Sequence, residues 1–396
     1  MKYTTTVVDY LRWRGDIPFS ADPFNEVDNL VLCIVSYLNF RRFPELLTRN
    51  PKEAVLLRDI SQKLTEEDEQ LGLSQLAYIP VVQQAAQTER FADVRMFAFE
   101  DRSDEEAQMQ FAAVSFLLPD KSVFIAFRGT DTTLVGWKED FNMSFLESVP
   151  AQVRAAEYAA EILKLCRFHR IRIGGHSKGG NLAAWAGLHL PRRAYDRLLA
   201  VYNNDGPGFF DNSPYRTKQY KELLSRYNHF IPSSSFVGVL LAFDKDYTVV
   251  KSKRILGPTQ HDLSTWQITD CDLKTLPRPS KLAKINELCL SGIMYRINRE
   301  QGQNFDRVAT AVIEGSGQVN LLGVSKHLPS VVKSTVKTWK SLDEDTRKEF
   351  RETFSGSKEI LKDSVKLVVT EGNKEAREEA LEDLALQGVK LEALKI

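Results

Sequence analysis

A serine stands between two glycines in the segment Gly175-His176-Ser177-Lys178-Gly179, which matches the pattern G-x-S-x-G. In hydrolases with this pattern, the serine sits on a sharp turn between a strand and a helix and attacks a carbonyl carbon. The β-branched run Ile171-Arg-Ile173 precedes the segment, and small residues typical of a packed helix follow it from Asn181. We therefore predict that Ser177 is a nucleophile. A glycine-rich turn with an incidental serine is the alternative interpretation.

A nucleophilic serine needs hydrogen-bond donors aimed at the negative charge that develops on the carbonyl oxygen. The backbone N–H of Lys178, the residue after the nucleophile, is the first expected donor. The second is expected after an earlier strand, where Val123–Phe127 runs into the turn Arg128-Gly129-Thr130. We predict that Thr130 and Lys178 form the oxyanion hole. An ordinary polar turn is the alternative at Thr130.

A general base must follow the nucleophile in the chain order of these hydrolases. His261, in the segment Gly257-Pro-Thr-Gln-His-Asp262, comes after the last predicted strand in a loop. An imidazole there can exchange protons near neutral pH. His189 falls on the helix after the serine, His229 inside a strand and His327 in the helical tail. We predict that His261 is the base, with a plain loop histidine as the alternative.

Two sets of motifs resemble known proteins. The segments Phe127-Arg-Gly-Thr130, Gly136-Trp-Lys-Glu-Asp140 and Gly175–Gly179 together resemble the class 3 (fungal-type) lipases, a branch of the α/β-hydrolase superfamily. Longer segments resemble an uncharacterised bacterial lipase-like family of the same superfamily; they are Asp9–Asp16, Phe24–Asp28, Gly175–Ala183 and Asn204–Phe209. This resemblance covers most of the chain and implies an α/β-hydrolase fold with a serine, an acid and a histidine in that order.

The acid is where the sequence departs from the class 3 pattern. Class 3 lipases carry it in an Asp-x-Val-Pro segment after the strand that corresponds to Tyr227–Ile231, and here that segment reads Pro232-Ser-Ser-Ser-Phe-Val237. We predict that Asp205, at the end of the preceding strand, supplies the carboxylate. The alternative is that a hydroxyl of Ser233–Ser235 orients His261, with weaker catalysis because no charge then stabilises the imidazolium. Asp262, Asp244 and Asp246 are weaker candidates.

Arg128 and Asp140 are predicted to support the site rather than to react. A buried pair between the two would fix the loop of the oxyanion hole.

The predicted elements divide the chain into three parts. Residues 1–88 are expected to form a helical segment packed on the core, residues 89–272 an α/β-hydrolase core, and residues 273–396 a charged helical extension. In the core, β-rich runs alternate with helical segments, which predicts a mostly parallel central sheet flanked by helices. In the extension, Leu361, Val365 and Val368 form one apolar stripe, and Leu381, Leu384 and Leu391 suggest another. We expect these stripes to pack against the protein rather than on a membrane surface.

The composition of the chain argues against several other kinds of function and location. Lys plus Arg and Asp plus Glu both total 53, so no excess of positive charge favours nucleic acid as a partner. The four cysteines are far apart and predict reduced thiols rather than a metal site or a disulfide framework. Met1–Asp16 lacks the apolar region of a secretory signal, and the longest apolar run, Phe236–Phe243, is too short for a transmembrane segment. We therefore predict a cytoplasmic location.

The predicted activity is hydrolysis of carboxylic esters, lipid esters included, through an acyl-enzyme and without a metal or nucleotide cofactor. The substrate is a small-molecule or lipid ester. A catalytically silent interaction module that binds partners through its helical tail is the alternative, because the acid is displaced. A thioesterase or peptidase would use the same triad. The sequence leaves the acyl chain length, a helical lid and the oligomeric state open.

Overall fold

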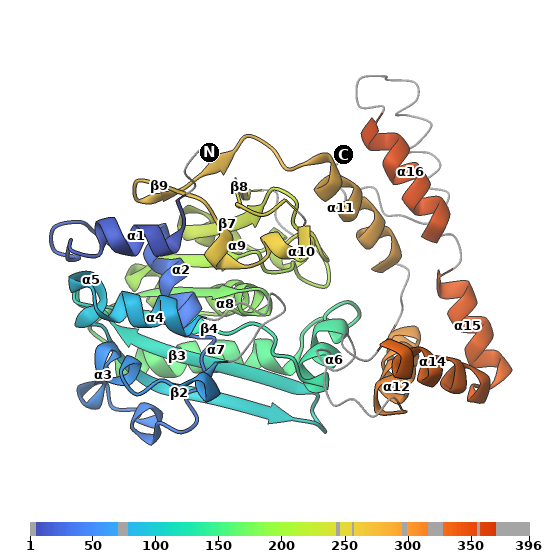
Figure 1. Ribbon diagram of the computed structural model, residues 1–396, viewed down its shortest axis with the longest axis horizontal. Coiled ribbons are helices and arrows are strands. Elements are labelled where there is room, and N and C mark those ends of the chain that lie inside the picture. The colour runs from blue at the N-terminus through green and yellow to red at the C-terminus, as the bar shows by residue number, and fades with distance from the viewer. Residues whose placement is uncertain are drawn as a thin grey trace.

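The computed structural model describes residues 5–69, 78–242, 246–255, 257–294, 299–315, 328–354 and 357–369. Within these residues the chain forms an α/β structure, in which a mixed sheet of nine strands has helices on both faces (Figure 1). The C-terminal helices lie beyond one end of the strands (Figure 1).

The large sheet has the strand order β1-β2-β3-β4-β5-β6-β7-β8-β11. Strands β4 to β8 pair in parallel, whereas β1, β2 and β3 at one edge and β11 at the other pair antiparallel with their neighbours. The strands are β1 Val55–Leu56, β2 Arg95–Asp104, β3 Met109–Leu117, β4 Ser122–Phe127, β5 Arg170–His176, β6 Leu198–Asn204, β7 Tyr227–Pro232, β8 Thr248–Val250 and β11 Thr275–Leu276. Two short strands, β9 Ile268–Thr269 and β10 Asp272–Leu273, form a separate hairpin.

The α-helices of the described residues are α1 Val7–Arg14, α2 Glu26–Val35, α3 Leu57–Ser61, α4 Ile79–Ala86, α5 Glu89–Ala92, α6 Leu134–Asn142, α7 Pro150–Leu165, α8 Lys178–Leu188, α9 Lys218–Leu223, α10 Gly257–Gln260, α11 Lys281–Met294, α12 Arg299–Gly315, α14 Leu328–Ser341, α15 Glu344–Phe354 and α16 Ser357–Val369.

The expected alternation of strands and helices is present from β4 to β7, whereas the described residues between β7 and β8 contain no helix. Strands β4 to β8 are parallel, as predicted. The sequence did not predict β2, which pairs antiparallel with β1 and β3 at one edge of the sheet. Its alternation is interrupted at Ala98, which has φ 55°, where the register with β3 shifts between Phe97 and Glu100. Such a bulge breaks the period of two by which a strand is recognised.

The sheet separates two apolar layers. On one face, Phe124 and Ala126 of β4 belong to a core that they share with α1, α2 and α4. On the other face, Val123, Ile125 and Phe127 of the same strand pack with α7 and α8. Successive residues of a strand point to opposite faces, so one short strand supports both layers. The N-terminal helices therefore cover the sheet as a full layer.

The C-terminal helices pack on one another and on α6. Helix α12 contacts α6, α14 and α15, while α16 contacts α11. In α16 the buried apolar residues are Ile360 and Leu367, and the predicted stripe is wrong because Leu361 and Val365 are 49% and 37% exposed. The buried face also contains Asp363 and Ser364, so apolar residues alone do not mark it.

Parts of the predicted tail lie outside the described residues, namely Leu381, Leu384 and Leu391, while the side chain of Val368 is not described.

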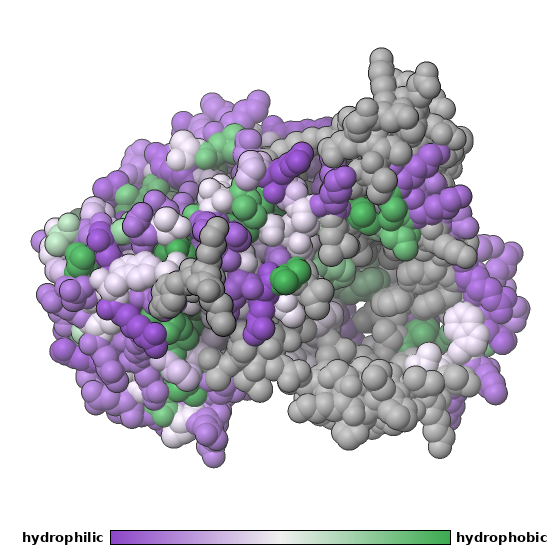
Figure 2. Space-filling view, turned by 45° about the horizontal axis from the view of Figure 1, so that its top comes forward, coloured by the Kyte–Doolittle hydropathy of each residue, from purple (hydrophilic) through white to green (hydrophobic). Residues whose placement is uncertain are grey.

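The coloured residues on the face of the molecule in Figure 2 are mainly hydrophilic, and the apolar residues among them lie in small separate groups.

A buried charge pair joins the N-terminal helices. Arg90 on α5 donates to both carboxylate oxygens of Asp28 on α2, at 2.7 and 2.6 Å, and both side chains are fully buried. The remaining guanidinium donors bond to the carbonyls of Ile17, Asp22 and Pro23. Asp28 also accepts from the hydroxyl of Tyr10 at 2.9 Å. The two N-terminal motifs thus meet in one polar network inside the apolar layer.

We expect Arg90→Leu to lower the free energy of unfolding by about 3–5 kcal/mol, because it leaves the buried carboxylate of Asp28 without its counter-charge. Urea denaturation measures the change. Arg58→Leu is the matched control, since Arg58 meets Asp93 at 3.8 Å with both side chains exposed and should contribute about 0–1 kcal/mol. Equal effects of the two substitutions would contradict the stabilising role of the buried network.

Candidate active site

Ser177 occupies a strained turn between β5 and α8. Its φ of 59° and ψ of −134° lie in a region that side-chain-bearing residues rarely adopt. The turn is possible because backbones touch around it. A Cβ on Gly175 would lie 2.0 Å from the carbonyl oxygen of Gly179, and one on Gly179 would lie 2.1 Å from that of Phe127. Only glycine fits at these two positions, as the pattern G-x-S-x-G requires.

The predicted donors of the oxyanion hole are near this serine. Lys178 is the first residue of α8, where a backbone N–H has no partner within the helix. The turn after β4 approaches from the other side, since a Cβ on Gly129 would lie 2.9 Å from the Cβ of Ser177. Thr130, the next residue, lines the same pocket as Ser177 and Lys178. The three residues are thus brought together.

Asp205 and His261 form a short hydrogen bond. The Asp205 Oδ2 and His261 Nδ1 atoms are 2.7 Å apart, although the residues are 56 positions apart in the chain. Asp205 follows β6 directly and is fully buried. Burial raises the pKa of its carboxyl above the usual value, and the hydrogen bonds from His261, Ser235 and Gly238 act in the opposite direction. A carboxylate placed this way orients an imidazole and favours one tautomer.

Ser235, one of the serines considered as an alternative to Asp205, forms a hydrogen bond with the Asp205 carboxylate. The hydroxyl of Ser235 donates to Asp205 Oδ1 at 2.5 Å, and the backbone N–H of Gly238 donates to the same oxygen at 3.1 Å. Ser235 is therefore a partner of Asp205 in the structure, and Asp205 is the partner of His261. Among the weaker candidates, Asp262 lines the pocket and Asp246 precedes β8, while Asp244 lies outside the described residues.

A second histidine, His176, forms a hydrogen bond with the backbone of His261. The carbonyl oxygen of His261 lies 2.7 Å from His176 Nε2, and the hydroxyl of Tyr37 lies 2.7 Å from His176 Nδ1. A carbonyl can only accept, so this network assigns the proton to Nε2. Burial, and then the neighbouring His261, lower the pKa of His176 well below its ordinary value. His176 is therefore a neutral link between the N-terminal layer and the loop of His261.

The predicted pair between Arg128 and Asp140 is wrong. Arg128 donates to both oxygens of Asp101 on β2, at 3.2 Å each, and lies 3.6 Å from Asp131. Asp140 instead accepts from the hydroxyl of Thr130, at 2.8 and 2.6 Å. The sequence could not indicate this exchange because β2, which supplies Asp101, was not predicted.

Lys178 also has partners that the sequence analysis missed. Its side chain is 2% exposed, and its ammonium group donates to Glu139 at 2.9 Å and to the side-chain oxygen of Gln110 at 2.7 Å. Glu139 in turn accepts from the backbone N–H groups of Gln110 and Ala151. The buried ion pair between Glu139 and Lys178 thus joins α6 to the start of α8.

Ser177 and His261 line one pocket of about 180 Å³. Its apolar wall is formed by Met143, Phe236, Val237, Leu240 and Leu241. Trp137 also lines it. The pocket offers an apolar chain a place beside the serine.

The other histidines are held elsewhere. His189 is exposed on the surface just after α8, where its Nδ1 meets the carbonyl of Trp185 at 2.8 Å. His229 is buried in β7, and burial lowers its pKa to about 3. His327 lies outside the described residues.

No group of three or more His, Cys, Asp or Glu side chains in the described part of the chain could hold a metal ion. None of the helices that the structure describes is both long and apolar enough to cross a membrane.

The sequence model of the Mbeg1-like family matches residues 85–309, which is more than half of the chain. The chain therefore belongs to the Mbeg1-like family, whose members are lipase-like. The matched range includes Ser177, Asp205 and His261. No curated protein matches the chain significantly.

The carboxyl group of Asp140 gives the site a pH-dependent stability. Burial, opposed in part by Lys178 and the Thr130 hydroxyl, raises the pKa of Asp140 from 3.8 to about 6. Between these values the folded state binds more protons than the unfolded chain, so this group lowers stability as the pH rises from about 4 to about 6.

We therefore expect Asp140→Asn to gain stability relative to the unsubstituted protein between pH 4.5 and pH 7. The full shift corresponds to about 3 kcal/mol, and the 31% exposure of the side chain reduces our expectation to about 1–2 kcal/mol. Urea denaturation at both pH values measures the difference, with Asp104→Asn as an exposed control. A difference that stays constant with pH would contradict the raised pKa.

Proposed function

We propose that this protein is a serine hydrolase of the α/β-hydrolase fold that cleaves carboxylic esters, lipid esters among them. The observation that carries the proposal is the hydrogen bond of 2.7 Å between Asp205 and His261, in a protein whose His261 and Ser177 line one pocket. The three residues follow the chain order nucleophile, acid, histidine. The lipase-like character of the Mbeg1-like family supports the same class of reaction.

In the proposed reaction, the Ser177 hydroxyl oxygen attacks the ester carbonyl carbon while His261 Nε2 accepts the hydroxyl proton. The carbonyl oxygen becomes an oxyanion, which the backbone N–H groups of Lys178 and Thr130 stabilise. When the tetrahedral intermediate collapses, the C–O bond to the leaving alcohol breaks and His261 returns the proton to that alcohol. Water, deprotonated by His261, then hydrolyses the acyl-enzyme.

Asp205 holds His261 by its Nδ1–H, so that Nε2 is free to exchange protons with Ser177 and the substrate. Ser235 and Gly238 supply the hydrogen bonds that keep the buried carboxylate in place. In this proposal the acid sits one strand earlier than in class 3 lipases, and the serine found in the later segment supports it. We propose that the protein is related to the class 3 lipases in spite of this difference in the position of the acid.

Thr130 and Asp140 are proposed to shape the oxyanion hole. The Thr130 hydroxyl is bonded to both carboxylate oxygens of Asp140, which fixes the turn that carries the Thr130 backbone N–H. Arg128 fixes the same turn through Asp101. These contacts replace the single Arg–Asp pair that the sequence predicted.

All of the proposed catalytic residues fall within 89–272, the proposed core, while residues 273–396 form the proposed helical extension.

The four cysteines are free thiols, and Cys33 and Cys166 are buried. Free thiols support the proposed cytoplasmic location, since reducing compartments keep cysteines in this form.

The first test of the proposal is covalent labelling with a fluorophosphonate probe, which reacts with activated serines. We expect the unsubstituted protein to be labelled and Ser177→Ala to lose the label, because the nucleophilic oxygen is gone. Ser103→Ala, at an exposed position of β2, should keep it. A folded protein that takes up no label would instead favour the silent interaction module.

The second test separates the acid from its alternative. We expect Asp205→Asn to lower kcat on a short nitrophenyl ester by roughly 10³–10⁴-fold, because the amide favours the wrong imidazole tautomer. Ser235→Ala, which removes only a partner of the carboxylate, should cost about tenfold or less. Circular dichroism checks that both variants fold. Asp205 would not be the triad acid if its substitution had the smaller effect.

A further inference from the structure

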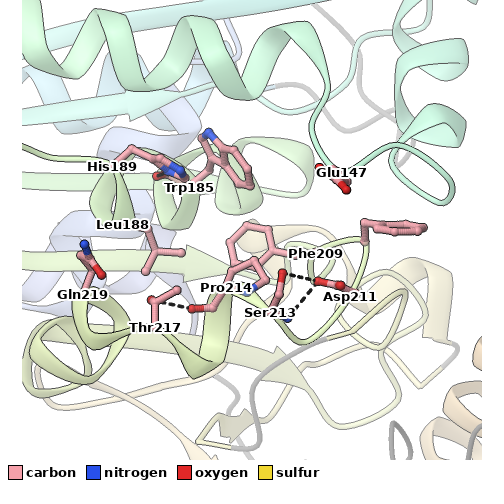
Figure 3. A pocket seen from close by; sticks show the side chains of 11 residues that line it. Glu147, Trp185, Leu188, His189, Phe209, Asp211, Ser213, Pro214, Thr217 and Gln219 are labelled. Carbon is pink, nitrogen blue, oxygen red and sulfur yellow. Dashed lines mark hydrogen bonds between the residues drawn. The ribbon is translucent and has the colours of Figure 1, made fainter.

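A second pocket, of about 440 Å³, is lined in part by residues at the C-terminal end of α8. It lies between the C-terminal end of that helix, the loop that follows β6, and the segment before α7 (Figure 3). None of its lining residues lines the pocket of Ser177. The proposed ester hydrolysis therefore assigns it no role.

Aromatic rings form the walls of this pocket. Phe209 is buried and meets Trp185 edge to face, with ring centroids 5.6 Å apart. Trp185 is also stacked on His189 at 4.2 Å, and the Nδ1 of His189 is tied to the Trp185 carbonyl. Phe210 adds a fourth ring from the loop after β6. Contacts with one another thus hold Trp185, His189 and Phe209 in place before any ligand arrives.

The charged residues that line the pocket are both acidic. Glu147 and Asp211 lie at the same end of it, on different segments (Figure 3). Asp211 is held by the backbone N–H and the hydroxyl of Ser213, at 2.8 and 2.6 Å, both on one carboxylate oxygen. Arg216 and Lys218 flank Thr217 in the chain but are not among the lining residues.

We propose that this pocket binds an organic cation with a quaternary ammonium head. The faces of aromatic rings attract cations, and the methyl groups of such a head pack against rings without needing hydrogen-bond acceptors. Two exposed carboxylates add attraction at longer range. A bare metal ion fits less well, because the described residues offer no group of three ligands here.

The probe is choline, and its matched control is 3,3-dimethylbutan-1-ol, in which a carbon atom replaces the charged nitrogen. Calorimetric titration of the full chain measures both. We expect choline to bind about five- to thirty-fold more tightly than the neutral alcohol. Equal affinities would show a merely apolar pocket and would overturn the proposal, as would no binding of choline.

Substitutions locate the binding. Trp185→Leu and the double variant Glu147→Gln with Asp211→Asn should each weaken choline binding by about fivefold or more. Trp13→Leu, at an exposed position of α1, and Ser177→Ala should leave it unchanged. Retention in Ser177→Ala keeps this result separate from the fate of the proposed hydrolase activity. Choline binding that none of the pocket variants weakens would place the cation elsewhere and overturn the proposal.

The same head group occurs on free solutes and on lipids. Co-sedimentation with phosphatidylcholine vesicles, compared with phosphatidylglycerol vesicles, distinguishes these two sources. Sedimentation with phosphatidylcholine alone, reversed by choline and lost in Trp185→Leu, would identify a lipid head group. Choline binding without sedimentation would identify a soluble cation, and both results support a quaternary ammonium ligand.

Discussion

The close contact of three backbone segments around Ser177 is the constraint on which the site depends. The end of β4, the end of β5 and the start of α8 approach so closely that Gly175 and Gly179 leave no space for a Cβ. Packing of α7 and α8 on one face of the sheet holds these segments together. The same contact brings Gly129, and with it the turn of Thr130, against the serine. The positions of the proposed nucleophile and of the proposed oxyanion donors thus follow from the same close packing.

Around this contact, polar groups are fixed by buried hydrogen bonds rather than by exposed ion pairs. Asp205 is held from the loop after β7, His261 through its side chain and its carbonyl, and Lys178 through Glu139. A buried polar group is costly unless it is paired, so each of these contacts restricts its partners to one arrangement. The segments involved are far apart in the chain, and the parallel strands bring their ends to one edge of the sheet.

Local patterns predicted much of this protein. The glycine spacing predicted the turn at Ser177, and β-rich runs predicted the parallel strands. Contacts between residues far apart in the chain were harder to predict, because a sequence shows which side chains can pair but not which strands are neighbours. Arg128 was assigned to Asp140, whereas a bulged strand, β2, supplies its partner Asp101. In α16, the buried face mixes apolar residues with Asp363, so the visible apolar stripe marked the exposed side.

The hydroxyl that contacts His176 comes from Tyr37, two residues after the end of α2 in the N-terminal layer. Tyr78, just before α4, lines the pocket as well. The wall of the pocket beside Ser177 is accordingly built from residues inside the matched region and from residues ahead of it. A fragment cut to the strands and helices around Ser177 would carry every proposed reactive group and still lack part of the cavity. The part of the chain needed to build the whole pocket is therefore longer than the stretch that contains the proposed reactive groups.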